Sequence, residues 1–169
     1  QPLAQRYFPP LEPKKGRSVI QIAVSGADSP QETIYQAYFY AIAQARESIY
    51  IQTPYFVPDQ SIVESLKMAA QSGIDVRIMI PCMPVQIMFP AIADHLCVHY
   101  ESLSYLEEVL ALGAKVHFYK DGFIHSKVVL VDGEMASVGT ANMDIRSFEL
   151  NFEVNAVIYD EETTQELEN

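Results

Sequence analysis

Three side chains suited to phosphate chemistry lie close together in the sequence. His125 and Lys127 are two residues apart, and Asn142 follows a Gly-Thr-Ala turn. In an extended chain, alternation places His125 and Lys127 on the same face of a strand, where the two cationic groups favour an anion between them. An imidazole can attack phosphorus or carry a proton, and ammonium and carboxamide groups can bind phosphate oxygens. We therefore expect phosphate chemistry that needs no metal or other cofactor.

Two carboxylates have the right placement to support these groups. Glu153 lies at a polar break in the apolar segment 152–159, where a carboxylate could fix the tautomer of an imidazole, as in a catalytic triad. Asp132 belongs to an Asp-Gly pair, for which turn formation is the favoured interpretation. Taken singly, His125 fits a structural histidine and Asn142 a turn residue. The joint spacing is what favours a functional site.

Alternating strands and helices must position these residues. Hydrophobic periodicity and turn signals predict helices at 33–46, 59–72 and 104–112, and strands at 18–25, 48–53, 75–80, 115–119, 126–131, 135–139 and 152–159. This alternation predicts an α/β fold with helices covering a mixed, largely parallel sheet. The Asp-Gly turn between two apolar runs predicts a hairpin within it.

Composition indicates a single globular domain with an acidic net charge. Residues 1–17 hold four prolines and a basic cluster and are interpreted as a linker, which leaves 18–169 as the domain. A net charge of -11 disfavours nucleic acid as a partner. Two cysteines make no disulfide framework and fit a reducing compartment. No apolar run is long enough to span a bilayer, so any membrane attachment is peripheral or lies outside this segment.

The segment 82–100 fits the alternating pattern poorly. It holds two prolines and two short apolar runs, and it is interpreted as a lipid-facing apolar loop, a divergent insert or a local sequence error. Four of its residues are possible zinc ligands by type, but their spacing matches no common zinc site: Cys82, His95, Cys97 and His99. We therefore predict no metal.

The spacing of the site residues resembles that of the phospholipase D superfamily. The pattern is H-x-K, four residues, Asp, six residues, then G-T-x-N. The run VGTANMDIRSFELNFE at 138–153 is similar to the C-terminal catalytic half of bacterial cardiolipin synthases, and YIQTPYFVPD at 50–59 and SGADS at 25–29 strengthen the likeness. The resemblance implies a phospholipase D-like α/β/α sandwich.

The resemblance also implies roles for individual residues. His125 corresponds to the nucleophile or its acid–base partner, and Glu153 to the carboxylate that holds the catalytic imidazole. Lys127, Thr140 and Asn142 correspond to phosphate ligands, with Thr140 standing where many members have serine. Asp132 completes the catalytic set as a support for the motif.

The family combines two H-x-K motifs in one active site, and this sequence has one. The segment is therefore expected to be half of a longer enzyme, partnered by an N-terminal half or by a second copy. The implied activity is transphosphatidylation, which makes cardiolipin from phosphatidylglycerol or a similar anionic phospholipid through a phosphohistidine. The full protein is expected at the cytoplasmic face of the cell membrane, with this segment soluble. The alternatives are a homodimeric phosphodiesterase or nuclease, and an inactive isolated half-domain.

Overall fold

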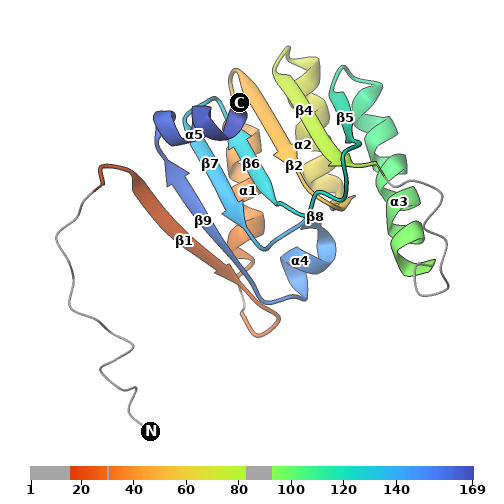
Figure 1. Cartoon of the computed structure of the whole chain (residues 1–169), viewed down its shortest axis with the longest axis horizontal. Helices are drawn as coiled ribbons and strands as arrows, with labels where there is room; N and C mark the ends of the chain where they lie inside the picture. The colour runs from red at the N-terminus through yellow and green to blue at the C-terminus, as the bar shows by residue number, and fades with distance from the viewer. Residues whose placement is uncertain (1–15, 30, 83–92) are drawn as a thin grey trace, which may run out of the picture.

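Strands from both halves of the chain form one mixed sheet. A computed structural model describes residues 16–29, 31–82 and 93–169. The main sheet has the order β1-β9-β7-β6-β2-β4-β5, and β3 and β8 form a separate small pair (Figure 1). The strands are β1 Val19–Ser25, β2 Ser48–Gln52, β3 Phe56–Val57, β4 Asp75–Pro81, β5 Lys115–Tyr119, β6 Val128–Val131, β7 Met135–Gly139, β8 Met143–Asp144 and β9 Glu153–Tyr159. The helices are α1 Thr33–Gln44, α2 Gln60–Gln71, α3 Ala93–Leu110, α4 Ile145–Glu149 and α5 Glu161–Glu168.

The strand directions bring distant parts of the sequence to one end of the sheet. β2, β4 and β5 are parallel to one another, whereas β6, β7, β9 and β1 continue the sheet as antiparallel neighbours. Consequently β2, β4, β5 and β7 finish at the same end where β6 and β9 begin, and we call this end the site edge. The opposite end, which carries the β6–β7 turn, is the far edge. The predicted α/β class and mixed sheet are confirmed. The expectation that the sheet is largely parallel is wrong, because four of its six strand pairs are antiparallel.

α1 and α2 cover one face of the sheet and build the core there (Figure 1). Tyr38 and Ile42 of α1 and Leu66 of α2 are buried against Ile51 and Ile78 of the central strands. α2 begins where it was predicted to begin. The Asp59 side chain accepts hydrogen bonds from the backbone N–H groups of residues 61 and 62, which satisfies two donors of the first turn.

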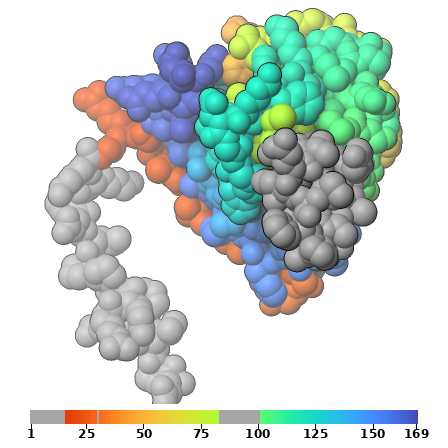
Figure 2. Space-filling model, turned by 45° about the vertical axis from the view of Figure 1, so that its right-hand side comes forward, coloured from red at the N-terminus to blue at the C-terminus, as the bar shows by residue number. Residues whose placement is uncertain are grey.

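The other face of the sheet is apolar and largely open along β1 and β9. α5 lies against β7 and β9 near the far edge (Figure 1). The strands beside it carry exposed apolar side chains. We call the following four residues the open apolar face, with their exposed fractions: Ile20 (55%), Ile22 (62%), Val24 (57%) and Val154 (45%). Figure 2 shows β1, in red-orange, along one side of the molecule. Alternation explains the pattern, because Ala23 between them is buried against the helices.

The structure corrects three details of the predicted elements. α3 begins at Ala93 rather than at residue 104. Residues 83–92 of the difficult segment lie outside the described residues. β6 begins at Val128 rather than at residue 126. The short elements β3, β8 and α4, and the C-terminal α5, were not predicted.

Candidate active site

His125 and Lys127 lie just before β6, at the site edge. Because β6 begins at Val128, the expectation that they share one face of a strand is wrong. The ammonium group of Lys127 turns back and donates to the backbone carbonyl of His125, with 2.7 Å between the two atoms. Lys127 is only 8% exposed, whereas His125 is exposed and its ring stacks on Phe123 with 5.8 Å between centroids. The His125 imidazole is therefore exposed to solvent, whereas most of Lys127 is covered by protein.

The environment of Lys127 suits an ammonium group that awaits an anion. Burial lowers the pKa of Lys127, and the nearby carboxylates of Glu153 and Asp144 act in the opposite direction. Within the described residues, the ammonium has no ion-pair contact and its hydrogen bond goes to a neutral carbonyl. A phosphate at this position would supply the opposite charge that the buried cation lacks.

Asn142 is held by the carboxylate of Asp144, which was not predicted to belong to the site. Its Nδ2 donates to Oδ2 of Asp144 at 3.0 Å, and the other carboxylate oxygen accepts from the backbone N–H of Ser147 at 2.6 Å. Asp144 is 9% exposed. Since an ionised carboxylate only accepts, the amide nitrogen must face Asp144. Within the part of the chain that the structure describes, Nδ2 makes this one hydrogen bond, which leaves one N–H for a ligand, and Oδ1 is buried without a partner.

The backbone N–H groups around Asn142 are all used inside the protein. Their acceptors are the carbonyl of Val154 for Thr140, Oδ1 of Asn155 for Ala141, Oγ of Ser147 for Asn142 and Oγ1 of Thr53 for Met143. The Thr140 hydroxyl accepts from the N–H of Val154 at 2.9 Å and donates to its carbonyl at 3.4 Å. Backbone donors are thus not free for phosphate here, and the side chains of Lys127 and Asn142 are the available ones. A phosphate role for Thr140 stays a prediction.

Glu153 begins β9 at the site edge, near Lys127 but without a bond to the imidazole. Its carboxylate accepts from Nδ2 of Asn151 at 3.2 Å, and no hydrogen bond joins it to His125 in the described part of the chain. Its negative charge raises the pKa of Lys127, against the effect of burial. The role of Glu153 in orienting a histidine stays a prediction.

Asp132 lies at the far edge and organises the backbone there. Its carboxylate accepts from the N–H groups of Arg46, Glu47 and Ser48, at distances from 2.8 to 3.1 Å, and so ties the β6–β7 turn to the start of β2. Its φ is 55°, and Gly133 follows with 67°, which is the backbone of the predicted hairpin turn. A whole strand separates Asp132 from Lys127, so its contribution to the motif is structural.

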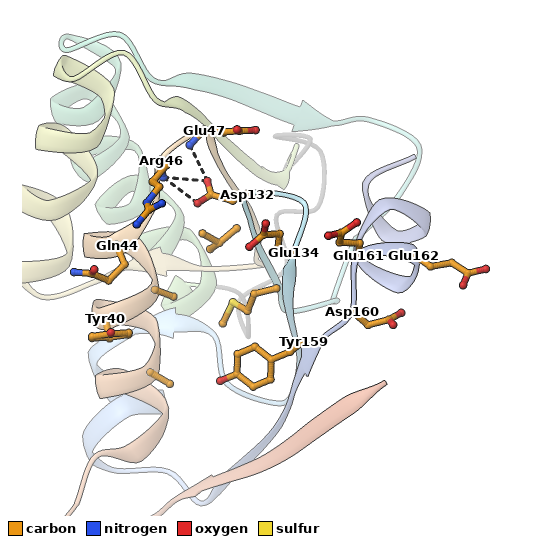
Figure 3. Close-up of a pocket in the computed structure, with 14 residues that line it drawn as sticks. Tyr40, Gln44, Arg46, Glu47, Asp132, Glu134, Tyr159, Asp160, Glu161 and Glu162 are labelled. Atoms are coloured by element: carbon orange, nitrogen blue, oxygen red, sulfur yellow. Dashed lines mark hydrogen bonds between the residues drawn. The ribbon is translucent and has the colours of Figure 1, made fainter. Parts of the chain in front are cut away.

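A groove also lies at the far edge, separate from His125. It has a volume of about 1140 Å³. Figure 3 shows Tyr40 and Gln44 of α1 on one side and Glu134, Tyr159 and Glu161 on the other. A second void, beside Lys127, is lined in part by Tyr38, Thr53 and Met143 and is too small to hold a water molecule. That space is far too small for a phospholipid headgroup with its chains.

Metal ligands and membrane-spanning helices were sought in the described parts of the chain. No group of three or more His, Cys, Asp or Glu side chains there is arranged to hold a metal ion. The side chains of His95, Cys97 and His99 lie outside what the structure describes, and Cys82 is a half-buried free thiol. None of the described helices combines the length and apolar character needed to cross a membrane.

The fold is that of the phospholipase D class. It is similar to Nuc of Salmonella typhimurium, a phospholipase D family member, with a TM-score of 0.69 and 20% sequence identity over 89% of this chain and 90% of that chain. It is also similar to phosphatidylserine synthase of Haemophilus influenzae, with a TM-score of 0.73 and 20% identity over 89% of this chain and 36% of that chain.

Within that class, the chain belongs to the family described as cardiolipin synthase, PLD-like domain, whose model matches residues 38–169. It is 49% identical to a cardiolipin synthase of Listeria monocytogenes serotype 4a over 97% of this chain and 32% of that protein. It is 48% identical to cardiolipin synthase 1 of Staphylococcus aureus strain COL over 96% of this chain and 31% of that protein. The chain therefore spans about a third of the length of these curated relatives.

Proposed function

We propose that the protein carrying this chain is a phosphatidyltransferase that makes cardiolipin from phosphatidylglycerol. The observation that carries this proposal is the identity of 49%, over nearly the whole chain, to a protein named cardiolipin synthase. The site edge supports it, because an exposed imidazole, a buried ammonium and an oriented carboxamide lie there: His125, Lys127 and Asn142. The chain's charge of -11 does not favour a nucleic-acid substrate.

The proposed reaction has two displacements at phosphorus. One histidine attacks the phosphorus of the first phosphatidylglycerol, the bond from phosphorus to the glycerol oxygen breaks, and a second histidine gives that oxygen its proton. A hydroxyl of another phosphatidylglycerol then loses its proton to the second histidine and attacks the phosphohistidine, whose N–P bond breaks. The products are cardiolipin and glycerol, and both histidines are restored. His125 is one of these two histidines.

In this proposal, Lys127 and Asn142 hold the phosphate oxygens in both steps. The Lys127 ammonium offsets the charge that builds up on those oxygens, in a site where little water weakens the attraction. The remaining N–H of Asn142 donates to a second oxygen. Because the loop backbone has no free N–H groups, these side chains carry the phosphate recognition.

We propose that a second half with its own H-x-K motif packs against the open apolar face and completes the site. This face adjoins the site edge, since Val24 pairs with Val154 and the next pair along the strands, Ser25 and Glu153, reaches that edge. Burying four exposed apolar side chains would contribute several kcal/mol to such an interface.

The membrane location proposed for the full protein follows from its substrate, which is a bilayer lipid. An acidic chain is repelled by an anionic membrane surface. The attachment at the cytoplasmic face is therefore proposed to come from the rest of the protein rather than from this segment.

The proposed function is tested by removing the imidazole from the full-length protein. Purified protein is mixed with phosphatidylglycerol in detergent micelles, and cardiolipin is separated by chromatography. The His125→Asn variant should form cardiolipin at least about 1000-fold more slowly, because covalent catalysis is lost. The matched control is His117→Asn, which changes an exposed histidine of β5 and should keep the wild-type rate. Equal rates for both variants would refute the assignment.

A further inference from the structure

A buried polar cluster lies directly beneath the loop that carries Asn142. Its centre is Asn155 in β9, which is 1% exposed. Oδ1 of Asn155 accepts from the backbone N–H of Ala141 at 3.2 Å, and Nδ2 donates to the hydroxyl of Tyr38 at 2.7 Å and to Oγ of Ser137 at 3.0 Å. Both N–H groups and the oxygen of this amide are therefore used.

These partners fix the orientation of the Asn155 amide. Because the backbone N–H of Ala141 can only donate, Oδ1 has to face it, and Nδ2 then faces the two hydroxyl groups. Tyr38 and Ser137 are themselves buried, at 1% and 0% exposed, and they come from α1 and β7. Burial raises the pKa of Tyr38 to about 12, so its hydroxyl stays neutral at physiological pH. The anchor of Ala141 is thus connected to two further elements of the core.

The atoms around Asn155 are tightly packed. A Cβ atom at position 139 would overlap Oδ1 of Asn155 and the carbonyl of Val154, which is why β7 ends in a glycine there. The loop from Gly139 to Asn142 therefore passes directly over the amide. A shift of Asn155 would move Ala141, and with it the residue that follows.

We propose that Asn155 is a positioning residue of the active site: it holds Ala141 so that the Asn142 side chain meets the same phosphate as Lys127. It touches no substrate, and the inference rests on the proposed phosphatidyl transfer. A buried amide is costly unless all its hydrogen bonds are made, so an apolar residue would fill this core position at lower cost if packing were its only task.

The test measures kcat for cardiolipin formation and thermal unfolding of the full-length protein. Asn155→Ala should lower kcat about 10- to 100-fold at a temperature where the variant is folded, because small errors in position are expensive in catalysis. The control is Ser65→Ala, which removes a buried hydroxyl that donates to the Ser61 carbonyl at 2.8 Å within α2. It should lower the melting temperature and leave kcat unchanged. A kcat of Asn155→Ala equal to that of the control would overturn the inference.

A second pair of variants covers the case in which Asn155→Ala does not fold. Tyr38→Phe and Ser137→Ala each remove one partner of Nδ2 and keep the bond to Ala141. Each should lower kcat about fivefold, the effect of one lost hydrogen bond. Wild-type kcat in both would contradict the positioning role.

Hydrogen exchange separates a failure of this inference from a failure of the proposed function. If the wild-type protein makes no cardiolipin, the proposed function fails, and exchange at the Ala141 amide decides the anchoring by itself. The rate at Ala141 should rise at least tenfold in Tyr38→Phe or Asn155→Ala, while amides in the middle of β4 keep their protection. An unchanged rate at Ala141 would overturn the inference.

Discussion

Lys127 shows how a single residue can be placed for function at a cost to stability. Its ammonium group is 8% exposed and is bound to a neutral carbonyl. Burial lowers its pKa more than the carboxylates of Glu153 and Asp144 raise it. The charged form is therefore less favourable in the folded chain than in water, and a bound phosphate would remove that cost.

Replacement of this ammonium should abolish transfer without weakening the fold. Lys127→Met keeps the length of the side chain and removes the charge, so at pH 7 the free energy of unfolding should stay equal or rise. The pKa of Lys127 in the folded chain lies below the ordinary value of about 10.4. The free energy of unfolding of the wild type should therefore rise relative to that of the variant as pH rises toward that value. Urea unfolding at pH 7 and pH 10 measures the stability of both proteins at neutral pH and its change at high pH.

The control for this prediction is Lys67→Met, whose ammonium is paired with Glu64 at 2.7 Å on the surface of α2. That variant should change stability little at either pH, because an exposed ion pair contributes little. A marked loss of stability in Lys127→Met at pH 7 would show that the ammonium is well paired in the folded protein, contrary to this account.

The sequence identifies the reactive residues of the candidate site better than the residues that hold them. His125, Lys127 and Asn142 could be selected because their chemical types occur at an informative spacing. Asp144 and Asn155 could not, because a single polar residue in an apolar stretch has many explanations. Their partners, such as Tyr38, are distant in the sequence and meet them only through the fold. The DIRS run after Asn142 was a signal for Asp144, since an Asp before a short helix is a typical N-cap.

At the level of elements, the β6–β7 hairpin is fastened to β2 by Asp132. Three backbone N–H groups at the start of β2 converge on its carboxylate, and its positive φ is one that Asp and Asn tolerate better than other residues. The hairpin in turn fixes where β6 begins, and hence where Lys127 lies. Asp132 therefore affects the site by holding the β6–β7 hairpin in place, and it does not contact the site residues.

Asp132→Ala should destabilise the chain by about 2 to 3 kcal/mol, because several hydrogen bonds to a charged group are lost at a strained φ. Asp132→Asn keeps an acceptor oxygen and the tolerated φ, and should cost about 1 kcal/mol. Urea unfolding measures both. In either variant, the rate of cardiolipin formation per folded molecule should stay close to that of wild type. A large loss of rate with little loss of stability would instead place Asp132 in the chemistry.

Elements with local signals could be predicted, and elements that depend on distant partners could not. The Asp59 cap, the glycine at the end of α2 and the Asp-Gly turn all act within a few residues. In contrast, β3 and β8 are two residues long and exist only because they pair with each other across the chain. The pairing order of the sheet also joins β1 to β9, which no local pattern in the sequence reveals.

At the scale of the whole molecule, the open apolar face and the small void beside Lys127 have one explanation. Exposed apolar side chains on β1 and β9 adjoin the reactive edge, and the void beside Lys127 is too small for a lipid headgroup. Both features fit a half that is completed by a second one, and the chain covers about a third of its curated relatives. Packing of the second half would cover the apolar face and at the same time enclose the active site.

The central claim is tested most directly by measuring cardiolipin formation with this chain alone, with the separately produced remainder of the protein, and with the two mixed. The account predicts no turnover by either part and recovered turnover in the mixture. Ile22→Lys on the open apolar face should reduce the recovery, and Leu110→Lys, at an exposed position of α3, should not. Turnover by this chain alone at the rate of the full-length protein would contradict the account.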